Sequence, residues 1–259
     1  MMKCLLHPLI LLLAFCSLAF CRLVDNFINN NGCPDFFLST SNGRVTPTIL
    51  QNQNRYRQIC QRYMGRDRFA TLYDTQNRIP VYSAYLHVPP ARLSRMNEWW
   101  TEPDLSHAQQ ADNRDYLGRM HRGHLYPASH NNDIEGMDAT FTLTNAAPQD
   151  QSFNSRWFQH VEEPVNKLIL VNCKGNRAYI VTGVVPSKKQ INNRVKEASH
   201  FWTAYCCLDN NGRLVGHGAY LMYRNGTMML NQNQNVRDLE NQLTSLYRGP
   251  FQVFGGHCY

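Results

Sequence analysis

Stretches with the composition and two-residue alternation of β-strands recur along this chain of 259 residues. The run at residues 68–74 is followed by a polar turn at 74–78 and a second run at 79–87, which predicts a hairpin. Tyr82 and Tyr85 of the second run are expected in the core. Further strands are expected at residues 140–144, 167–171, 178–185, 200–208 and 213–223, with turns at 173–176 and 209–212.

Helical spacing is confined to fewer segments. Residues 236–247 are expected to form a helix that packs on the sheet, and residues 54–64 a short helix that carries Cys60. The first of these rests on apolar residues three and four positions apart, which are Val236, Leu239, Leu243 and Leu246.

A third helix is expected to begin at Phe153, with Ser152 as its N-cap. Three- and four-residue steps place five residues near one face, namely Asn154, Phe158, Val161, Glu162 and Val165. Pro164 removes a backbone donor and crowds the preceding turn, so we expect it to kink or end this helix.

Three polar stretches are expected to be irregular. They are residues 26–54, 89–117 and 188–196, of which the last is basic and rich in Asn. We expect Trp99 and Trp100 to pack the second stretch onto the body, with contact to a substrate as the alternative.

The first 21 residues have the pattern of a secretory signal peptide. Lys3 gives a positive start, residues 9–20 form an apolar run too short to cross a bilayer, and residues 19–21 offer a cleavage site. An uncleaved N-terminal anchor is the alternative. Removal of the segment leaves residues 22–259, in which no linker or repeat marks a second domain and no run approaches a membrane-spanning length.

Nine cysteines are present, and Cys4, Cys16 and Cys21 would leave with the signal. The remaining six allow 15 pairings into three disulfides. They are Cys33, Cys60, Cys173, Cys206, Cys207 and Cys258. Our prediction pairs Cys33 with Cys60 and gives the adjacent Cys206 and Cys207 different partners, Cys173 and Cys258. A zinc site is the alternative, and the absence of any CxxC pair disfavours it.

The charge of the mature chain is modestly basic. Without Lys3 it has 25 Lys and Arg against 19 Asp and Glu, a net charge of +6, which fits a polyanionic ligand without identifying one. Five arginines gather in one stretch, Arg55, Arg57, Arg62, Arg66 and Arg68. They form either a phosphate-contacting patch or, as is commoner for such runs, a solvated face. Asn225-Gly226-Thr227 is a glycosylation sequon.

Residues with hydrolytic chemistry gather between positions 119 and 163. They form three blocks, Arg122-Gly123-His124, then Asn145 with Pro148-Gln149, then Asn154 and Glu162 eight residues apart. In this order and spacing the blocks resemble the DNA/RNA non-specific endonucleases. The resemblance extends over roughly residues 33–258, and phrases such as residues 68–74, 79–85 and 202–207 look like the vertebrate endonuclease domain-containing 1 subgroup. One departure stands out, because His121 occupies the place of an acidic residue.

The resemblance implies both a fold and roles. The fold would be α+β, with a mainly antiparallel central sheet flanked by helices and a ββα-metal finger. His124 would be the general base, since a neutral imidazole accepts a proton near pH 7. Asn154 would be the direct ligand of Mg²⁺, or of Mn²⁺ as the alternative, and Glu162 would hold a metal-bound water. Arg122 would bind phosphate, and Asn145 would brace the site.

The leading hypothesis is therefore a secreted, extracellular, Mg²⁺-dependent endonuclease. It would cut DNA and RNA with contacts to backbone phosphates, without a membrane anchor after signal removal and in an oligomeric state that the sequence leaves open. The second hypothesis, which His121 supports, is a catalytically weak secreted binding glycoprotein on the same fold. His107 and His130 have no partner in the sequence that makes them ligands, and we expect them to be surface or satisfied histidines.

Overall fold

The computed structural model describes residues 21–94, 98–118, 120–224 and 235–259. A seven-stranded sheet in the order β1-β4-β5-β6-β9-β10-β11 forms its centre, and every neighbouring pair is antiparallel. Its strands are β1 (Cys21–Val24), β4 (Tyr56–Tyr63), β5 (Arg66–Asp74), β6 (Ile79–Leu86), β9 (Arg177–Ile191), β10 (Val195–Leu208) and β11 (Leu214–Tyr223). The α+β class and the mainly antiparallel sheet are confirmed.

Two small ribbons and several helices complete the fold. The ribbons are β2 (Leu38–Thr40) with β3 (Gly43–Val45), and β7 (Met120–His124) with β8 (Ala146–Asp150). The α-helices are α1 (Ile134–Ala139), α2 (Gln151–Trp157), α3 (Glu163–Asn172) and α4 (Val236–Tyr247), and a π-helical turn, η5 (Phe158–Glu162), joins α2 to α3. Single 3-10 turns are η1 (Pro34–Phe36), η2 (Asn113–Tyr116), η3 (Ala128–His130) and η4 (Leu143–Asn145).

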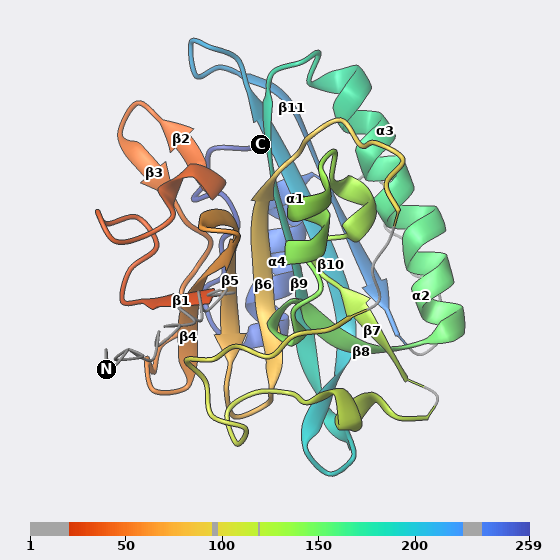
Figure 1. The fold of residues 1–259 in the computed structure, drawn as a ribbon. Coiled ribbons are helices and arrows are strands. Elements are labelled where there is room, and N and C mark those ends of the chain that lie inside the picture. The colour runs from red at the N-terminus through yellow and green to blue at the C-terminus, as the bar shows by residue number, and fades with distance from the viewer. Residues whose placement is uncertain (1–20, 95–97, 119, 225–234) are drawn as a thin grey trace, which may run out of the picture.

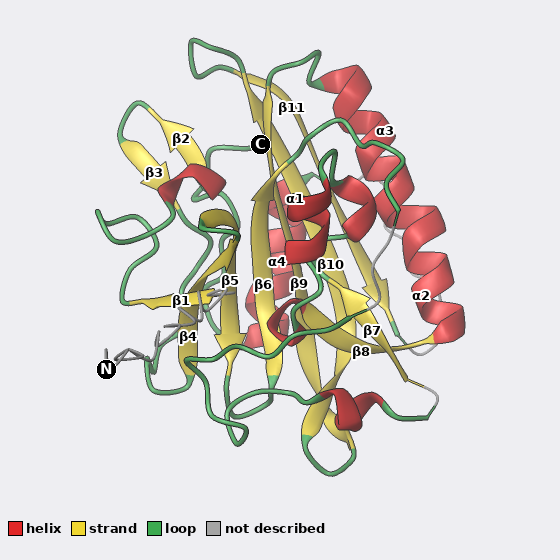
Figure 2. Cartoon of the chain, viewed as in Figure 1, coloured by secondary structure: helices red, strands yellow, loops and turns green. Residues whose placement is uncertain are grey.

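Helices cover both faces of the sheet. In Figures 1 and 2, α1, α2 and α3 lie on the near side and to the right of it, and α4 lies behind it. Along β10, Phe201 and Tyr205 pack into the core beneath α2 and α3, and Trp202 and Ala204 into the core beneath α4. This alternation follows from strand geometry, in which successive side chains point to opposite faces.

The three expected disulfides are present, Cys33–Cys60, Cys173–Cys207 and Cys206–Cys258. Because Cys206 and Cys207 are neighbours on β10, they point to opposite faces. Cys207 therefore reaches Cys173 just after α3, and Cys206 reaches Cys258 near the C-terminal end of the chain. The adjacent pair ties one layer of the molecule to each side of a single strand.

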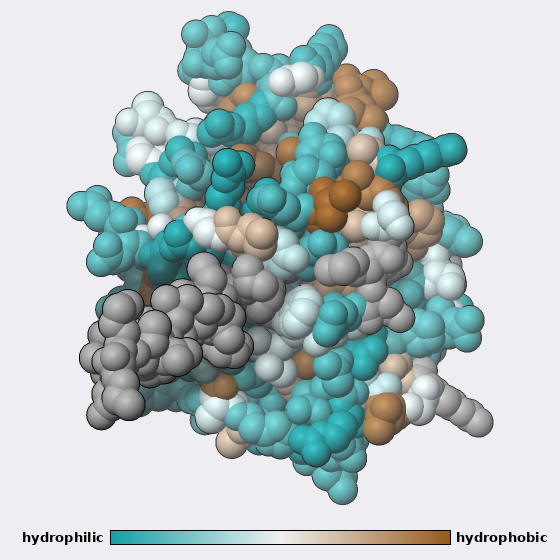
Figure 3. All heavy atoms as spheres, in the orientation of Figure 1, coloured by the Kyte–Doolittle hydropathy of each residue, from teal (hydrophilic) through white to brown (hydrophobic). Residues whose placement is uncertain are grey.

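The surface view is mostly hydrophilic, and hydrophobic side chains occupy small separate areas of the face seen in Figure 3. Among the described residues, none of the helices combines the length and the apolar character that crossing a bilayer requires. The sequon at residues 225–227 and residues 1–20 of the expected signal lie outside the described residues. Strand β1 begins at Cys21, which pairs with Gln61.

Several expectations from the pattern hold. The hairpin of β5 and β6 is present, Tyr82 and Tyr85 are buried, and α4 spans the predicted residues. The loop predicted at residues 188–196 is wrong, because β9 and β10 continue into it. They meet in a tight turn in which Asn192 and Asn193 both have positive φ, 48° and 50°, and Arg194 N–H donates to Ile191 O. Asn tolerates this left-handed conformation, so the three residues between the two strands can reverse the chain.

The helix expected at residues 54–64 is wrong, since this segment is β4. Two of its polar residues, Gln58 and Gln61, are buried and hydrogen-bonded, which hides the strand period. Gln58 bonds the backbone of Phe27 and Asp25, and Gln61 donates to Thr144. The helix was predicted because these two buried glutamines have the polar character expected of a solvent-exposed helix face.

The strand expected at residues 167–171 is also wrong, because these residues belong to α3. Val165 and Ile169 are buried, whereas Leu170 and Val171 are 49% and 69% exposed. The run is apolar but only one side of it faces the core, and Lys167 pairs with Glu163 one helical turn away.

Residues 140–144 do not form the predicted strand, which begins instead at Ala146. Thr142 and Thr144 turn their hydroxyls inward and donate to the buried carboxylate of Glu102. The alternation of hydroxyl and apolar residues that predicted a strand therefore reflects an internal hydrogen-bond cluster.

Candidate active site

A ββα element carries the three sequence blocks. Strands β7 and β8 pair with Arg122 opposite Pro148 and His124 opposite Ala146, and the chain then enters α2. Asp150 caps this helix by accepting a hydrogen bond from Phe153 N–H at 2.8 Å. Ser152, the predicted cap, instead lies in the first turn and donates to Asp150 at 2.7 Å.

Three predicted site residues line one cavity of about 140 Å³. His124 comes from the end of β7, Asn154 from α2 and Glu162 from η5. The remaining lining residues are Pro127, Ala128, Ser129 and Phe158. Residues distant in sequence or on separate elements therefore share one small, mostly polar space.

The π-helical turn explains how Asn154 and Glu162 reach the same cavity. Eight residues of an α-helix exceed two full turns, about 7.2 residues, by a large fraction of a residue, so the two side chains would point in different directions. In η5 the Glu163 N–H donates to Phe158 O, five residues earlier, and each turn of such a helix holds more residues. Eight residues then come closer to two complete turns.

Pro164 was predicted to kink or end this helix, and it does not end it. It lies in the first turn of α3, directly after the wide turn, and the helix continues to Asn172. A proline in a regular helix leaves the carbonyl four residues earlier without its donor and crowds it. The π-helical turn widens the backbone where this conflict would arise. The hydrogen-bond pattern therefore changes locally, and the helix continues.

His124 is held between aromatic rings. Its imidazole lies 4.6 Å from the Trp99 ring and 4.9 Å from the Phe141 ring, measured between centroids, and the residue is 8% exposed. Trp99 packs the stretch before η2 against the rest of the protein, as expected. The side chain that it contacts there is His124, the predicted general base. The sequence offered no signal for this contact.

Gly123 allows β7 and β8 to approach. A Cβ built on it would lie 2.2 Å from the Gln149 side chain, which is itself fully buried. The glycine of the first block and the glutamine of the second are therefore one packing unit, and they set the position of His124 next to them.

Arg122 lies beside this cavity and does not line it. Its guanidinium lies 5.8 Å from the centre of the Trp99 ring and 5.5 Å from that of Tyr116, and it donates to Asn113 O at 3.3 Å. Burial lowers the pKa of Arg122, yet a guanidinium stays charged in proteins. None of the ion pairs found among the described residues involves it, so this half-buried cation suits an anionic ligand.

Asn145 is fully buried, and its side chain makes four hydrogen bonds. Its Oδ1 accepts from Tyr126 N–H and the Ser83 hydroxyl, and its Nδ2 donates to Tyr126 O and Thr140 O. It lies outside the cavity lining and joins the two ends of the segment between β7 and β8.

The arginine stretch does not form one patch. Arg55 pairs with Asp74 at 2.6 Å, and Arg68 pairs with Asp133 and Glu135. These two charges are neutralised by carboxylates, which favours the interpretation as a structural, solvated face.

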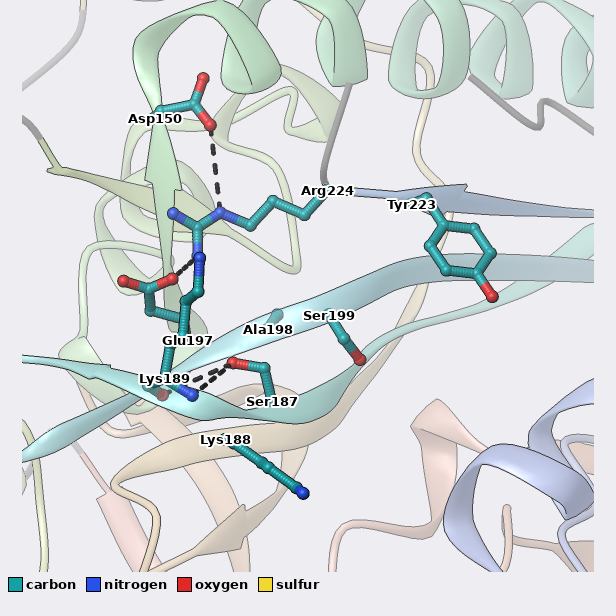
Figure 4. A pocket seen from close by; sticks show the side chains of 9 residues that line it. All are labelled: Asp150, Ser187, Lys188, Lys189, Glu197, Ala198, Ser199, Tyr223 and Arg224. Atoms are coloured by element: carbon teal, nitrogen blue, oxygen red, sulfur yellow. Dashed lines mark hydrogen bonds and ion pairs between the residues drawn. The ribbon is translucent and has the colours of Figure 1, made fainter. Parts of the chain in front are cut away.

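A second cavity, of about 520 Å³, lies at the end of β7 and β8 farther from His124 (Figure 4). Its lining includes Arg224, which pairs with Glu197 and reaches Asp150 at 3.9 Å. Since Asp150 caps α2, this network fixes the start of the helix that carries Asn154. Glu197 and Asp150 offset the charge of Arg224, and Lys188 and Lys189 add two further positive charges to the lining. We place the chemistry in the smaller cavity, because residues of the three sequence blocks line it.

The donor set of that smaller cavity fits a hard, strongly hydrated cation. Asn154 and Glu162 present amide and carboxylate oxygens, the ligand type that Mg²⁺ prefers while keeping several waters. Within the described part of the chain, no three His, Cys, Asp or Glu side chains cluster as a metal cage.

The sequence model for DNA/RNA non-specific endonucleases matches residues 47–249, which include all three blocks. The chain belongs to the DNA/RNA non-specific endonuclease family. Among its relatives, human endonuclease domain-containing 1 protein is 35% identical over 199 residues, covering 68% of this chain and 38% of the relative. The mouse protein of the same name is 32% identical over 237 residues, covering 82% and 45%. The chain thus spans less than half the length of either.

A solved structure shares the fold of this endonuclease family member. It is a chain of the EndoG/EndoGI complex, with a TM-score of 0.54 and 21% identity, covering 67% of this chain and 80% of that one. This likeness concerns the fold, and it agrees with the ββα element described above.

Proposed function

We propose that this chain is a metal-dependent endonuclease that hydrolyses internal phosphodiester bonds of DNA and RNA. The observation that supports it most is the shared cavity of His124, Asn154 and Glu162, which come from three elements within the family's region. Contacts to phosphate rather than to base edges predict little sequence preference.

Each residue has a task suited to its place. His124 takes the proton of the attacking water, and the rings of Trp99 and Phe141 fix its orientation. Arg122 binds the phosphate and stabilises its growing negative charge. Asn154 would hold Mg²⁺, with Mn²⁺ as the alternative, and Glu162 would hold a water on the ion. The ion, when bound, polarises the phosphate and neutralises charge near the leaving oxygen.

The proposal includes secretion with removal of residues 1–21. Three disulfides between buried cysteines support an oxidising compartment, because such bonds are rare where thiols are kept reduced. Residues 22–259 would then act as the extracellular endonuclease domain, and glycosylation at Asn225 is part of the same proposal.

The experiment is cleavage of supercoiled plasmid and of a long RNA by the purified protein, with Mg²⁺ and with a chelator. We expect metal-dependent nicking that falls by roughly 10²–10⁴-fold in His124→Ala, the usual effect of losing a positioned general base. His107→Ala, which changes a largely exposed histidine, is the matched control. Equal cutting by His124→Ala and the parent would exclude His124 as the base.

A binding glycoprotein on the same fold is the second candidate function, and His121 is the observation that favours it. A parent protein that binds DNA but leaves it uncut at saturating Mg²⁺ would support this alternative.

A further inference from the structure

His130 is a buried histidine that does not line the candidate site but contacts the backbone of Glu162, which does. It is 3% exposed, and its Nε2 lies 3.1 Å from the backbone oxygen of Glu162. Its Nδ1 lies 3.3 Å from the hydroxyl of Tyr85 on β6. The sequence predicted a surface or a satisfied histidine, and the second alternative is confirmed. It did not predict that the partner would be Glu162, which lines the cavity.

We infer that His130 is a positioning residue that fixes the Glu162 turn so that the Glu162 carboxylate stays aligned with Asn154 in the cavity. The inference rests on the proposed function, because it assigns His130 a role toward the same metal site. His130 itself touches neither the cavity nor a substrate.

The hydrogen bonds determine which ring nitrogen carries the proton. A backbone carbonyl only accepts, so Nε2 must donate to Glu162 O. Burial lowers the pKa of His130 to about 4, so the ring is neutral near pH 7 and Nδ1 is bare. That bare nitrogen accepts from the Tyr85 hydroxyl. The Glu162 carbonyl therefore selects the Nε2–H tautomer, and the Tyr85 hydroxyl stabilises it by donating to Nδ1.

The hydrogen bond from His130 to Glu162 matters because of where Glu162 lies in the helix. Glu162 ends the π-helical turn, and the wide turn is what brings Asn154 and Glu162 into one cavity. One helical turn farther on, His87 Nε2 donates to the Asn166 side chain at 2.6 Å. Two imidazoles, whose centroids are 6.4 Å apart, thus hold the joint between η5 and α3 against β6.

The turn that contains His130 also forms one wall of the cavity. Ala128 and Ser129 of η3 line it, and His130 is the next residue. A shift of Glu162 relative to η3 would therefore change the cavity from two sides at once.

The test measures metal binding separately from cleavage. Binding of Mn²⁺ is followed by electron paramagnetic resonance in a His124→Ala background, with His130→Leu, His130→Gln and Tyr85→Phe added in turn. We expect His130→Leu to weaken Mn²⁺ binding about 10–100-fold, the usual effect of losing such an outer hydrogen bond. His130→Gln, whose amide can still donate, should recover most of it. His107→Leu is the matched control.

Two further readouts separate positioning from simple stabilisation. In the parent protein, ¹⁵N resonances should show the Nε2–H tautomer of His130, and in Tyr85→Phe the Nδ1 resonance should shift, because that nitrogen loses its donor. In His130→Leu and Tyr85→Phe, the rate of amide hydrogen exchange at residues 159–166 should increase more than the rate in α4. If His130→Leu does not fold, Tyr85→Phe and His130→Gln carry the same comparison.

Unchanged Mn²⁺ affinity in folded His130→Leu or Tyr85→Phe would overturn the inference, whatever their melting temperatures. An Nδ1–H tautomer in the parent would overturn it as well. A parent that cuts no nucleic acid would instead contradict the proposed function, while the tautomer and Mn²⁺ results still decide the role of His130.

Discussion

At the scale of single residues, His121 marks the departure from the family pattern. It is exposed on β7, opposite Gln149, whereas Arg122 is half-buried and His124 is buried. It does not line the cavity of His124, Asn154 and Glu162. A residue at this place can brace the strand without contacting the reacting phosphate.

We therefore predict that the parent protein is active and that His121→Asp changes its rate less than about tenfold, or about 1.4 kcal/mol of barrier. The measurement is the initial rate on duplex DNA at saturating Mg²⁺, with His124→Ala as the comparison that should lose far more. An inactive parent that His121→Asp switches on would show that the substitution disarmed the site.

His130 also predicts a dependence of stability on pH. Its pKa of about 4 in the folded protein lies below the ordinary value of about 6.5, so the unfolded chain binds more protons between these values. Its contribution to stability is complete above about pH 6.5, is lost as the pH falls toward 4, and amounts to roughly 3 kcal/mol. Burial lowers the pKa of the neighbouring His87 too, which acts in the same direction.

Urea unfolding at pH 7 and pH 4 measures this effect. We expect His130→Gln to lose less stability over that interval than the parent, by about the amount given above, because glutamine does not titrate. Identical losses in both proteins would mean that His130 is not held neutral by burial.

At the scale of elements, the β7–β8 ribbon depends on the approach of Gly123 to Gln149. We predict that Gly123→Ala destabilises the protein by about 1–3 kcal/mol, the usual cost of overpacking, and lowers cleavage by displacing His124. Gly249→Ala is the matched control, since a Cβ there meets nothing within 4 Å. Equal unfolding free energies for the two variants would show that the β7–β8 ribbon accommodates a Cβ at position 123 without a steric conflict.

The elements also show what the sequence could reveal. A helix with apolar residues on one side only, such as α4, was predicted to the residue because nothing else competes for its period. Strand β4 was not predicted, because Gln58 and Gln61 are buried and form hydrogen bonds with residues distant in sequence. Local pattern fails where long-range hydrogen bonds make burial of a polar residue favourable.

The same limit applies to the site. The resemblance to the family predicted that Asn154 and Glu162 act together, although a regular helix would have left them out of phase. The π-helical turn that aligns them was not predictable, and neither were Trp99 against His124 nor His130 against Glu162. Those contacts join segments that have no sequence period in common.

At the scale of the whole molecule, β10 is the strand on which both covering layers are fastened. Cys207 bonds Cys173 at the end of α3, on the side of the candidate site, and Cys206 bonds Cys258 on the side of α4. These bonds close 34 and 52 residues of chain. Because loop-closure entropy grows only slowly with length, the two should stabilise the fold almost equally, by about 4 kcal/mol each in the chain-entropy estimate.

Their functional effects should differ, which gives the last prediction. We expect Cys173→Ala with Cys207→Ala to increase amide exchange along α3 and to weaken Mn²⁺ binding, because α3 follows directly on Glu162. Cys206→Ala with Cys258→Ala should lose similar stability but leave Mn²⁺ affinity close to that of the parent. Before either comparison, mass analysis should join Cys206 and Cys207 to different partners, and the purified protein should expose no free thiol when denatured. Two or more free thiols in the native protein would contradict the three-disulfide frame. Equal Mn²⁺ affinities in the two double variants would show that the layers on the two faces of β10 support the site alike.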